Sequence, residues 1–247
     1  MPTTLITGAS SGLGAEMARQ LAARGHDLAL CARRTDRLVE LATEITTAHP
    51  DRRVVVKALD VNDHDAVFRV FEEFRDELGG LDRVVVNAGL GKGQPLGTGR
   101  FDANRETAET NFIGALAQTE AAAGIFRAQQ AGHLVMVSSF SALRGMPRNI
   151  TTYAATKAAV AHLAEGFRAD VHGTPIKVTT LFPGYIRTEM NEGAKHLPFE
   201  VSAAVGSKAM VAAIEREPAT ACVPWWPWAP MSLVMRLVPL RLVSKLA

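Results

Sequence analysis

The sequence contains few cysteines, and its other metal-ligating residues form no cluster. Two cysteines occur among 247 residues, Cys31 and Cys222, and they lie far apart along the chain. They make neither a disulfide framework nor a spaced zinc motif, which favours a reducing compartment. The seven histidines are scattered without metal-ligand spacing. No metal site is therefore expected.

Long apolar runs and an excess of one charge sign are also missing. No run of about 18 uncharged apolar residues exists, so no transmembrane helix is expected. The first residues, MPTTLITG, lack the regions of a signal peptide, and we expect a cytoplasmic protein. The net charge is only +2, from 27 basic and 25 acidic residues. Nucleic acid is therefore not an expected partner.

Strand and helix patterns alternate along the chain. The predicted strands are Thr4–Thr7, Leu28–Ala32, Val54–Leu59, Val84–Asn87, His133–Ser138, Ile176–Phe182 and Ala221–Val223. The predicted helices are Gly12–Arg24, Asp36–Ala48, Asp63–Leu78, Ala103–Gln129 and Thr152–His172. Several strands are continuous apolar runs, which is typical of parallel strands covered on both faces. We predict one α/β domain over residues 1–247: a Rossmann-type, doubly wound parallel sheet of about seven strands with helices on both faces.

A glycine-rich turn, TGASSGLG, follows the first predicted strand. Its spacing differs from the standard dinucleotide fingerprint, and on its own such a turn is a weak signal. At the first strand–helix junction, however, glycines let the backbone approach a pyrophosphate, and the helix N-terminus supplies free N–H groups. The predicted phosphate contacts are Gly8, Ser10, Ser11, Gly12, Leu13 and Gly14.

The end of the second strand indicates which cofactor is used. Ala32 stands where NAD-binding sheets carry an acidic residue for the ribose, and Arg33 and Arg34 follow it. The two arginines have a simpler interpretation as solvated residues at a helix start, but cations are unfavourable there. Arginine pairs well with phosphate. We predict NADP(H), bound at its 2′-phosphate mainly by Arg33, with Arg34, Ser10 and Ser11 contributing.

Tyr153 and Lys157 lie four residues apart on a predicted helix and therefore share a face. A nearby ammonium lowers the pKa of a phenol, which allows proton exchange with an alcohol near neutral pH. Such a pair is common on protein surfaces. Here it follows a strand that ends at Ser138-Ser139, and the carboxyl ends of strands carry the active site in such sheets.

Taken in order, these motifs resemble those of the short-chain dehydrogenase/reductase family over essentially the whole chain. The matching residues are Thr7–Gly14, Asp60-Val61, Asn87-Ala88-Gly89, Asn111–Gly114, Ser139, Tyr153–Lys157 and Pro183-Gly184 with Thr188. The resemblance implies a nicotinamide-dependent oxidoreductase that interconverts an alcohol and a carbonyl compound.

The resemblance also implies roles for individual residues. Tyr153 would donate the proton in reduction, and Lys157 would lower its pKa and bind the nicotinamide ribose. Ser139 would hold the substrate oxygen, and Asn111 would position a relay water. Other cofactor contacts would come from Asp60, Val61, Asn87, Ala88, Gly89, Pro183, Gly184, Ile186 and Thr188, besides Tyr153 and Lys157.

One spacing departs from the family pattern. The distance from Ser139 to Tyr153 is one residue longer than usual, and the distance from Ser141 is one residue shorter. We favour Ser139 because it ends the strand, and we place the extra residue in the loop Pro147–Thr152.

The substrate side of the predicted site is apolar. Its walls would come from residues 90–99, residues 140–150 and a substrate lid at 185–217, with Leu143, Met146, Met190, Leu197 and Phe199. A largely apolar small-molecule carbonyl or alcohol is therefore the expected substrate. The C-terminal tail, residues 224–247, holds all three tryptophans and only basic charges, Arg236, Arg241 and Lys245. It is predicted to cover the pocket or a subunit contact; the alternative is peripheral membrane contact.

Two further expectations concern assembly and activity. The helices Ala103–Gln129 and Thr152–His172 are rich in alanine and should pack closely. The family resemblance implies that they form a two-fold interface, so we expect a homodimer, and a homotetramer stays open. A lyase or isomerase reusing the fold is one rival function. A catalytically idle NADP-binding sensor or interaction protein is another. The intact set Asn111, Ser139, Tyr153 and Lys157 favours an enzyme.

Overall fold

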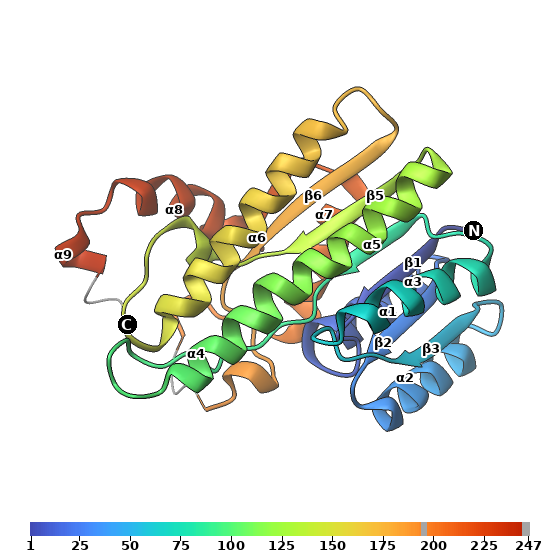
Figure 1. The fold of residues 1–247 in the computed structure, drawn as a ribbon, viewed down its shortest axis with the longest axis horizontal. Coiled ribbons are helices and arrows are strands. Elements are labelled where there is room, and N and C mark those ends of the chain that lie inside the picture. The colour runs from blue at the N-terminus through green and yellow to red at the C-terminus, as the bar shows by residue number, and fades with distance from the viewer. Residues whose placement is uncertain (194–196, 244–247) are drawn as a thin grey trace.

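The computed structural model describes residues 1–193 and 197–243. The described residues form a seven-stranded sheet in the order β3-β2-β1-β4-β5-β6-β7, and every neighbouring pair is parallel. The strands are β1 (Thr3–Thr7), β2 (Asp27–Ala32), β3 (Val54–Ala58), β4 (Arg83–Val86), β5 (Gly132–Val137), β6 (Ile176–Pro183) and β7 (Thr220–Val223). The predicted doubly wound α/β sheet is confirmed (Figure 1).

Helices cover both faces of this sheet. They are α1 (Gly12–Ala22), α2 (Thr35–Ala48), α3 (His64–Leu78), α5 (Gly114–Gln129), α6 (Thr151–Asp170) and α7 (Ala203–Arg216). Buried side chains of α1, α2 and α7 form one core cluster with one face of the strands. Those of α3, α5 and α6 form a second cluster with the other face. Each strand is thus buried on both sides, which explains its continuous apolar sequence.

The strand order reverses between β1 and β4. The chain leaves β1 toward β2 and β3, and then returns to pair β4 with the other side of β1. The loops after β1 and β4 therefore diverge to opposite faces and leave a crevice at the carboxyl ends of the strands. Ligands bind at this switch point in open parallel sheets.

The predicted helix Ala103–Gln129 consists of three parts. Helix α4 covers Phe101–Ala108, a π-helical turn covers Glu109–Ile113, and α5 follows without a break. The wider turn carries Asn111, one of the predicted site residues. Such turns insert an extra residue into a helix and occur often at functional sites.

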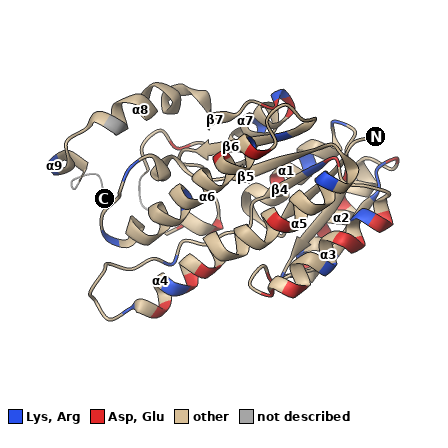
Figure 2. Ribbon diagram, turned by 45° about the horizontal axis from the view of Figure 1, so that its top comes forward, with Lys and Arg blue, Asp and Glu red and all other residues tan. Residues whose placement is uncertain are grey.

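The C-terminal tail forms α8 (Trp225–Leu237) and α9 (Leu240–Val243). Pro239 lies between the two helices, as expected for a residue that cannot continue a helix. Regular helix begins at Pro227, after the non-helical Trp226, and Pro230 lies near this start. In Figure 2 charged residues occur along α2 and α3, whereas most of the α8 ribbon has the colour of uncharged residues.

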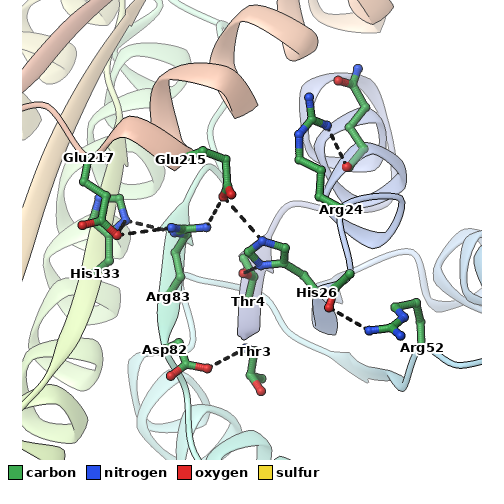
Figure 3. A network of polar contacts seen from close by, with 12 residues as sticks. Thr3, Thr4, Arg24, His26, Arg52, Asp82, Arg83, His133, Glu215 and Glu217 are labelled. Carbon is green, nitrogen blue, oxygen red and sulfur yellow. Dashed lines mark hydrogen bonds and ion pairs between the residues drawn. The ribbon is translucent and has the colours of Figure 1, made fainter. Parts of the chain in front are cut away.

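A buried polar network lies at the amino-terminal ends of the strands (Figure 3). Arg83 is 8% exposed and donates to Glu215 Oε1 at 2.6 Å and to His133 Nδ1 at 2.9 Å. The other ring nitrogen, His133 Nε2, lies 2.9 Å from Thr179 Oγ1. Burial, with the Arg83 charge second, lowers the pKa of His133 to about 3. This neutral, buried histidine lies at the end opposite the crevice.

Within the described ranges, no helix is long and apolar enough to cross a membrane. The same residues contain no group of three metal-ligating side chains. Residues 194–196 of the predicted lid and 244–247 of the tail, including Lys245, lie outside the described residues.

Candidate active site

The glycine turn after β1 has a backbone that few other residues could adopt. Gly8 and Gly12 have φ values of +63° and +54°, in the left-handed region. A Cβ on Gly8 would lie 2.9 Å from the Cα of Ala88, and one on Gly14 would lie 2.4 Å from the Gly8 carbonyl oxygen. The turn is thus closed tightly against α1 and the loop after β4. Its first helical residues leave free N–H groups at this end of α1.

Thr7 ties the two sides of the crevice together. Its Oγ1 accepts hydrogen bonds from the backbone N–H groups of Asn87, at 3.1 Å, and Ala88, at 3.0 Å. The Asn87 side chain donates to the Thr7 carbonyl at 2.9 Å. The predicted contacts Asn87 and Ala88 therefore lie directly against the glycine turn.

The arginine pair after β2 splits into two environments. Arg34 donates to Ser10 Oγ at 3.3 Å and to Ser11 Oγ at 2.6 Å, so its guanidinium lies on the glycine turn. The Arg33 side chain is 67% exposed, and its Nη1 lies 3.9 Å from Asp60 Oδ2. Arg34 therefore lies at the turn with the two predicted serines, whereas the exposed Arg33 lies beside Asp60 after β3.

The carboxylate of Glu189 also lies beside Arg34. It accepts from Arg34 at 3.2 Å and from Arg37 at 2.7 Å. Hydrogen bonds from Arg37 and then Arg34 hold the pKa of Glu189 below its usual value. The segment after β6 is thereby linked to the start of α2.

Ser139 and Tyr153 meet at the carboxyl end of β5. Ser139 caps a short 3-10 turn, Phe140–Leu143, and its Oγ accepts from the Ser141 N–H at 3.2 Å and from Ser141 Oγ at 3.0 Å. The hydroxyl of Tyr153, on the first turn of α6, shares a hydrogen bond with Ser139. The residue that reaches Tyr153 is therefore Ser139, with Ser141 behind it.

Lys157 lies one helical turn further along α6 and is 5% exposed. Its Nζ donates to the Val137 carbonyl at 2.9 Å and lies 5.9 Å from the centroid of the Tyr153 ring. A Cβ on Gly89 would lie 3.4 Å from this Nζ, so the loop after β4 lies directly beside the ammonium. Burial lowers the pKa of Lys157 to about 8.

The pKa of Tyr153 differs in direction from the sequence-based expectation. Burial raises it above its ordinary value, the hydrogen bond with Ser139 acts in the opposite direction, and the neighbouring Tyr185 adds to the rise. The reason is that desolvation penalises the phenolate. In this structure Tyr153 is a phenol at neutral pH, which suits a proton donor.

Asn111 fastens the loop after β4. Its Oδ1 accepts from the Leu90 N–H at 2.8 Å, and its Nδ2 donates to the Leu90 carbonyl at 2.8 Å and to Thr156 Oγ1 at 3.3 Å. The side-chain amide is engaged in these bonds. A relay water at this residue would therefore have to be held by its other atoms.

The remaining predicted contacts surround the crevice. Asp60 and Val61 follow β3, and Val61 packs against Gly114 at the start of α5. Pro183 ends β6, and the next residue, Gly184, lies against the tail: a Cβ there would be 2.0 Å from Cε2 of Trp228. Only glycine fits beside this indole.

The loop beyond Gly184 folds back over the glycine turn. Ile186 is buried against Gly206 of α7. A Cβ on Gly12 would lie 3.4 Å from the side chain of Thr188. The structure thus brings Thr188 to the glycine turn, whereas Ile186 is packed against α7.

Three residues near the site were missed from the sequence. Asn104 fastens the loop 90–99, accepting from the Gln94 N–H at 2.9 Å and donating to its carbonyl at 3.0 Å. Trp228 packs edge-on against Phe140, with ring centroids 4.7 Å apart. Glu189 is the third. Each acts through a residue distant in sequence, so no local motif marks it.

Comparisons with known proteins agree with this geometry. The family model of the short chain dehydrogenases matches residues 2–197. The chain belongs to this family. It is 54% identical over 243 residues to an uncharacterized oxidoreductase of Mycobacterium tuberculosis strain H37Rv, covering 98% of this chain and 96% of that one.

Solved structures of family members resemble the whole fold. A short-chain dehydrogenase/reductase from Burkholderia phymatum in complex with NAD gives a TM-score of 0.85 at 20% identity, over 100% of this chain and 96% of that one. An alcohol dehydrogenase from the archaeon Thermococcus sibiricus, complexed with 5-hydroxy-NADP, gives 0.80 at 26% identity, over 90% and 95%. The chain is therefore an oxidoreductase of the short-chain dehydrogenase/reductase family, with a fold that binds a nicotinamide cofactor.

Proposed function

We propose that this protein is an NADP(H)-dependent oxidoreductase that transfers a hydride between nicotinamide and the carbonyl or alcohol carbon of a largely apolar small molecule. The observation that carries the proposal is the hydrogen bond between Ser139 and Tyr153, with the buried Lys157 one helical turn away. We propose that the substrate oxygen binds between Ser139 and Tyr153.

The residues of the crevice suit a dinucleotide. Gly8 and Gly14 have no room for a Cβ, so the turn packs closely against the start of α1. The free N–H groups at this helix N-terminus are the groups that would hold a pyrophosphate. Asp60 and Val61 would border the adenine, and Asn87, Ala88 and Gly89 the ribose. Pro183, Gly184, Ile186 and Thr188 would hold the carboxamide end of the nicotinamide.

The choice of NADP(H) rests on the two cations that follow β2, of which Arg34 lies on that turn. Arg33 has its side chain exposed, and Arg34 already donates to Ser10 and Ser11. Guanidinium groups pair bidentately with a phosphate, and Ala32 supplies no carboxylate for a ribose hydroxyl. Arg33 would contribute most to phosphate binding, because Arg34 must first give up its hydrogen bond to Glu189.

When bound, the cofactor supplies the hydride chemistry. The chain's own residues manage the oxygen and the proton. Ser139 orients the substrate oxygen, and Tyr153, held as a phenol by burial, donates its proton to that oxygen in the reductive direction. Lys157 binds the nicotinamide ribose and, while charged, favours the tyrosinate that remains.

An apolar substrate is supported by the side chains next to Ser139. Phe140, Met146 and Trp228 form a buried cluster with Leu143 and Tyr185 packed against it. This cluster combines the loop after β5, the loop after β6 and the tail. We propose that it forms the wall of the substrate pocket.

The proposed lid, residues 185–217, is fastened at its base. Ile186 and Val201 form an isolated parallel bridge, and the Arg187 N–H donates to the Val201 carbonyl at 2.9 Å. Arg187 also donates to Glu200 Oε2 at 2.6 Å. Between these anchors, Met190 and Phe199 have exposed side chains that we propose contact the substrate.

We also propose a cytoplasmic homodimer formed through α5 and α6. The outer surface between the two helices is a groove lined by small and apolar residues together with charged ones. Its lining includes Leu116, Thr119, Ala123, Leu163, Gly166 and Phe167. Small residues on both helices allow a second copy to approach closely. Light scattering at micromolar concentration, which should report twice the monomer mass, tests this part.

The proposed activity is tested by a panel of apolar ketones and aldehydes with NADPH, followed at the NADPH absorbance band. Turnover on at least one compound, lost in Tyr153→Phe, is the expected result. Tight NADPH binding without turnover on the whole panel would instead favour the idle sensor.

A further inference from the structure

Helix α8 is apolar on two opposite sides. Its inner stripe is Trp228, Met231 and Met235, of which Trp228 is 2% and Met235 7% exposed. These positions are spaced by three and four residues, as one face of a helix requires. They pack on the active-site loops, so the tail covers the substrate side of the proposed site.

The outer side carries large apolar side chains that no described residue covers. Leu233, Val234 and Leu237 are 69%, 59% and 84% exposed, and they share the face opposite Trp228. Two tryptophans, Trp225 and Trp226, are each 69% exposed at the start of the same helix. Leu240 and Leu242 of α9 are exposed as well. A gathering of exposed large apolar side chains on one segment is typical of an interaction site.

The charge of the tail has a single sign. From Pro218 to the last residue the sequence has no aspartate or glutamate, whereas it has Arg236, Arg241 and Lys245. In Figure 2 the ribbon of α8 and α9 carries no acidic residue, while acidic residues line α2 and α3. The nearby loop 140–150 adds Arg144 and Arg148 and is also free of acidic residues.

We propose that the outer face of α8 and α9 binds the surface of an anionic lipid bilayer. Tryptophan and leucine would enter the boundary between headgroups and acyl chains, and the exclusively basic charge of the tail would favour anionic headgroups over neutral ones. The helix lies in the interface rather than crossing it, because it is too short and too interrupted by proline to span. This surface is separate from the catalytic residues, so it stands whether or not the proposed reaction is correct.

Binding would turn the substrate side of the molecule toward the lipid. The same helix that faces the bilayer with Leu233 and Leu237 packs with Trp228 against Phe140, next to Ser139. Apolar compounds dissolved in the bilayer would then have a short path to the pocket.

The tryptophans make the proposal directly measurable. The chain has three, all within residues 225–228, so its indole fluorescence reports on this segment alone. The full-length protein is titrated with vesicles of phosphatidylcholine, with or without phosphatidylserine, some prepared with brominated acyl chains. We expect a blue shift and bromine quenching with phosphatidylserine vesicles. Added salt should weaken the vesicle affinity by about fivefold for each basic residue whose charge it screens.

A matched pair of variants assigns the contact to this face. Leu233→Ser combined with Leu237→Ser should weaken vesicle binding about tenfold or more, because two apolar side chains no longer enter the lipid. The control, Val39→Ser combined with Phe68→Ser, removes two exposed apolar side chains from α2 and α3 and should bind like the unmodified protein. Circular dichroism and NADPH binding show whether each variant is folded.

Three results would overturn the proposal. One is the absence of a spectral shift with phosphatidylserine vesicles. Another is equal binding to vesicles of phosphatidylcholine alone, which would exclude the anionic headgroups. The last is a blue shift that grows with protein concentration without lipid, which would assign the face to a second copy of the chain.

Discussion

Arg33→Ala should separate NADPH from NADH binding. The Arg33 side chain is 67% exposed, and the acidic atom paired with it, Asp60 Oδ2, is 3.9 Å away. Arg33 therefore loses little interaction energy with Asp60 when it pairs with a phosphate. A hydrogen bond to a charged group contributes about 1.5–3 kcal/mol, which corresponds to about 10–150-fold in affinity. Solvent screening of so exposed a side chain places the expected loss near the lower end, about 10–30-fold.

The assay is the dissociation constant of each cofactor, from calorimetry, with 2′,5′-ADP as a third ligand that isolates the phosphate contact. NADPH and 2′,5′-ADP should both weaken in Arg33→Ala, whereas NADH should change little. Arg34→Ala should cost less, because Arg34 is already paired with Glu189. Arg69→Ala, which removes an exposed arginine from α3, is the matched control. An equal loss for NADH and NADPH would refute the reasoning.

Three further predictions concern charge. Glu189→Gln should tighten 2′,5′-ADP binding by up to about fivefold in the same titrations, because an exposed ion pair contributes about 0–1 kcal/mol; a weaker complex would contradict it. Lys157→Met should raise the free energy of unfolding at pH 7 by roughly 1–3 kcal/mol in urea titrations. The pKa of Lys157 is about 8 in the folded state, below its unfolded value, so wild-type stability rises between pH 8 and about 10.5, and the variant should lose this rise. Acid should also destabilise the protein through His133, whose folded pKa of about 3 lies below its unfolded value. The contribution of His133 to the free energy of unfolding should fall by about 3 kcal/mol between pH 6.5 and 4. In His133→Gln, the free energy of unfolding should depend less on pH over the same range.

The fold could be predicted because the apolar runs, the helical periodicity and the glycine turn all indicate the same architecture. Apolar runs marked the buried strands, and α-helical periodicity marked the helices between them, as at β2 and α2. The glycine turn could be assigned because its position after β1 leaves few alternatives. Tyr153 and Lys157 became meaningful only from their place after the strand that ends at Ser139.

Other features depend on contacts that no local pattern encodes. The π-helical turn at Asn111 changes the helix by one residue, and a periodicity read over Ala103–Gln129 cannot detect it. The proline-rich tail gave no clean helical face in sequence, yet Trp228 reaches Gly184 across the fold. The direction of the Tyr153 pKa depends on burial, which a spacing of four residues does not reveal.

The most direct test of the proposed function is the chemical step in Tyr153→Phe. The substitution keeps the ring and removes the proton that the substrate oxygen must receive. With the best carbonyl substrate and saturating NADPH, single-turnover oxidation of the cofactor should slow by about 10²–10⁴-fold, while the NADPH dissociation constant changes little. A single-turnover rate close to that of the wild type would show that this tyrosine is not the proton donor and that the active site has been misassigned.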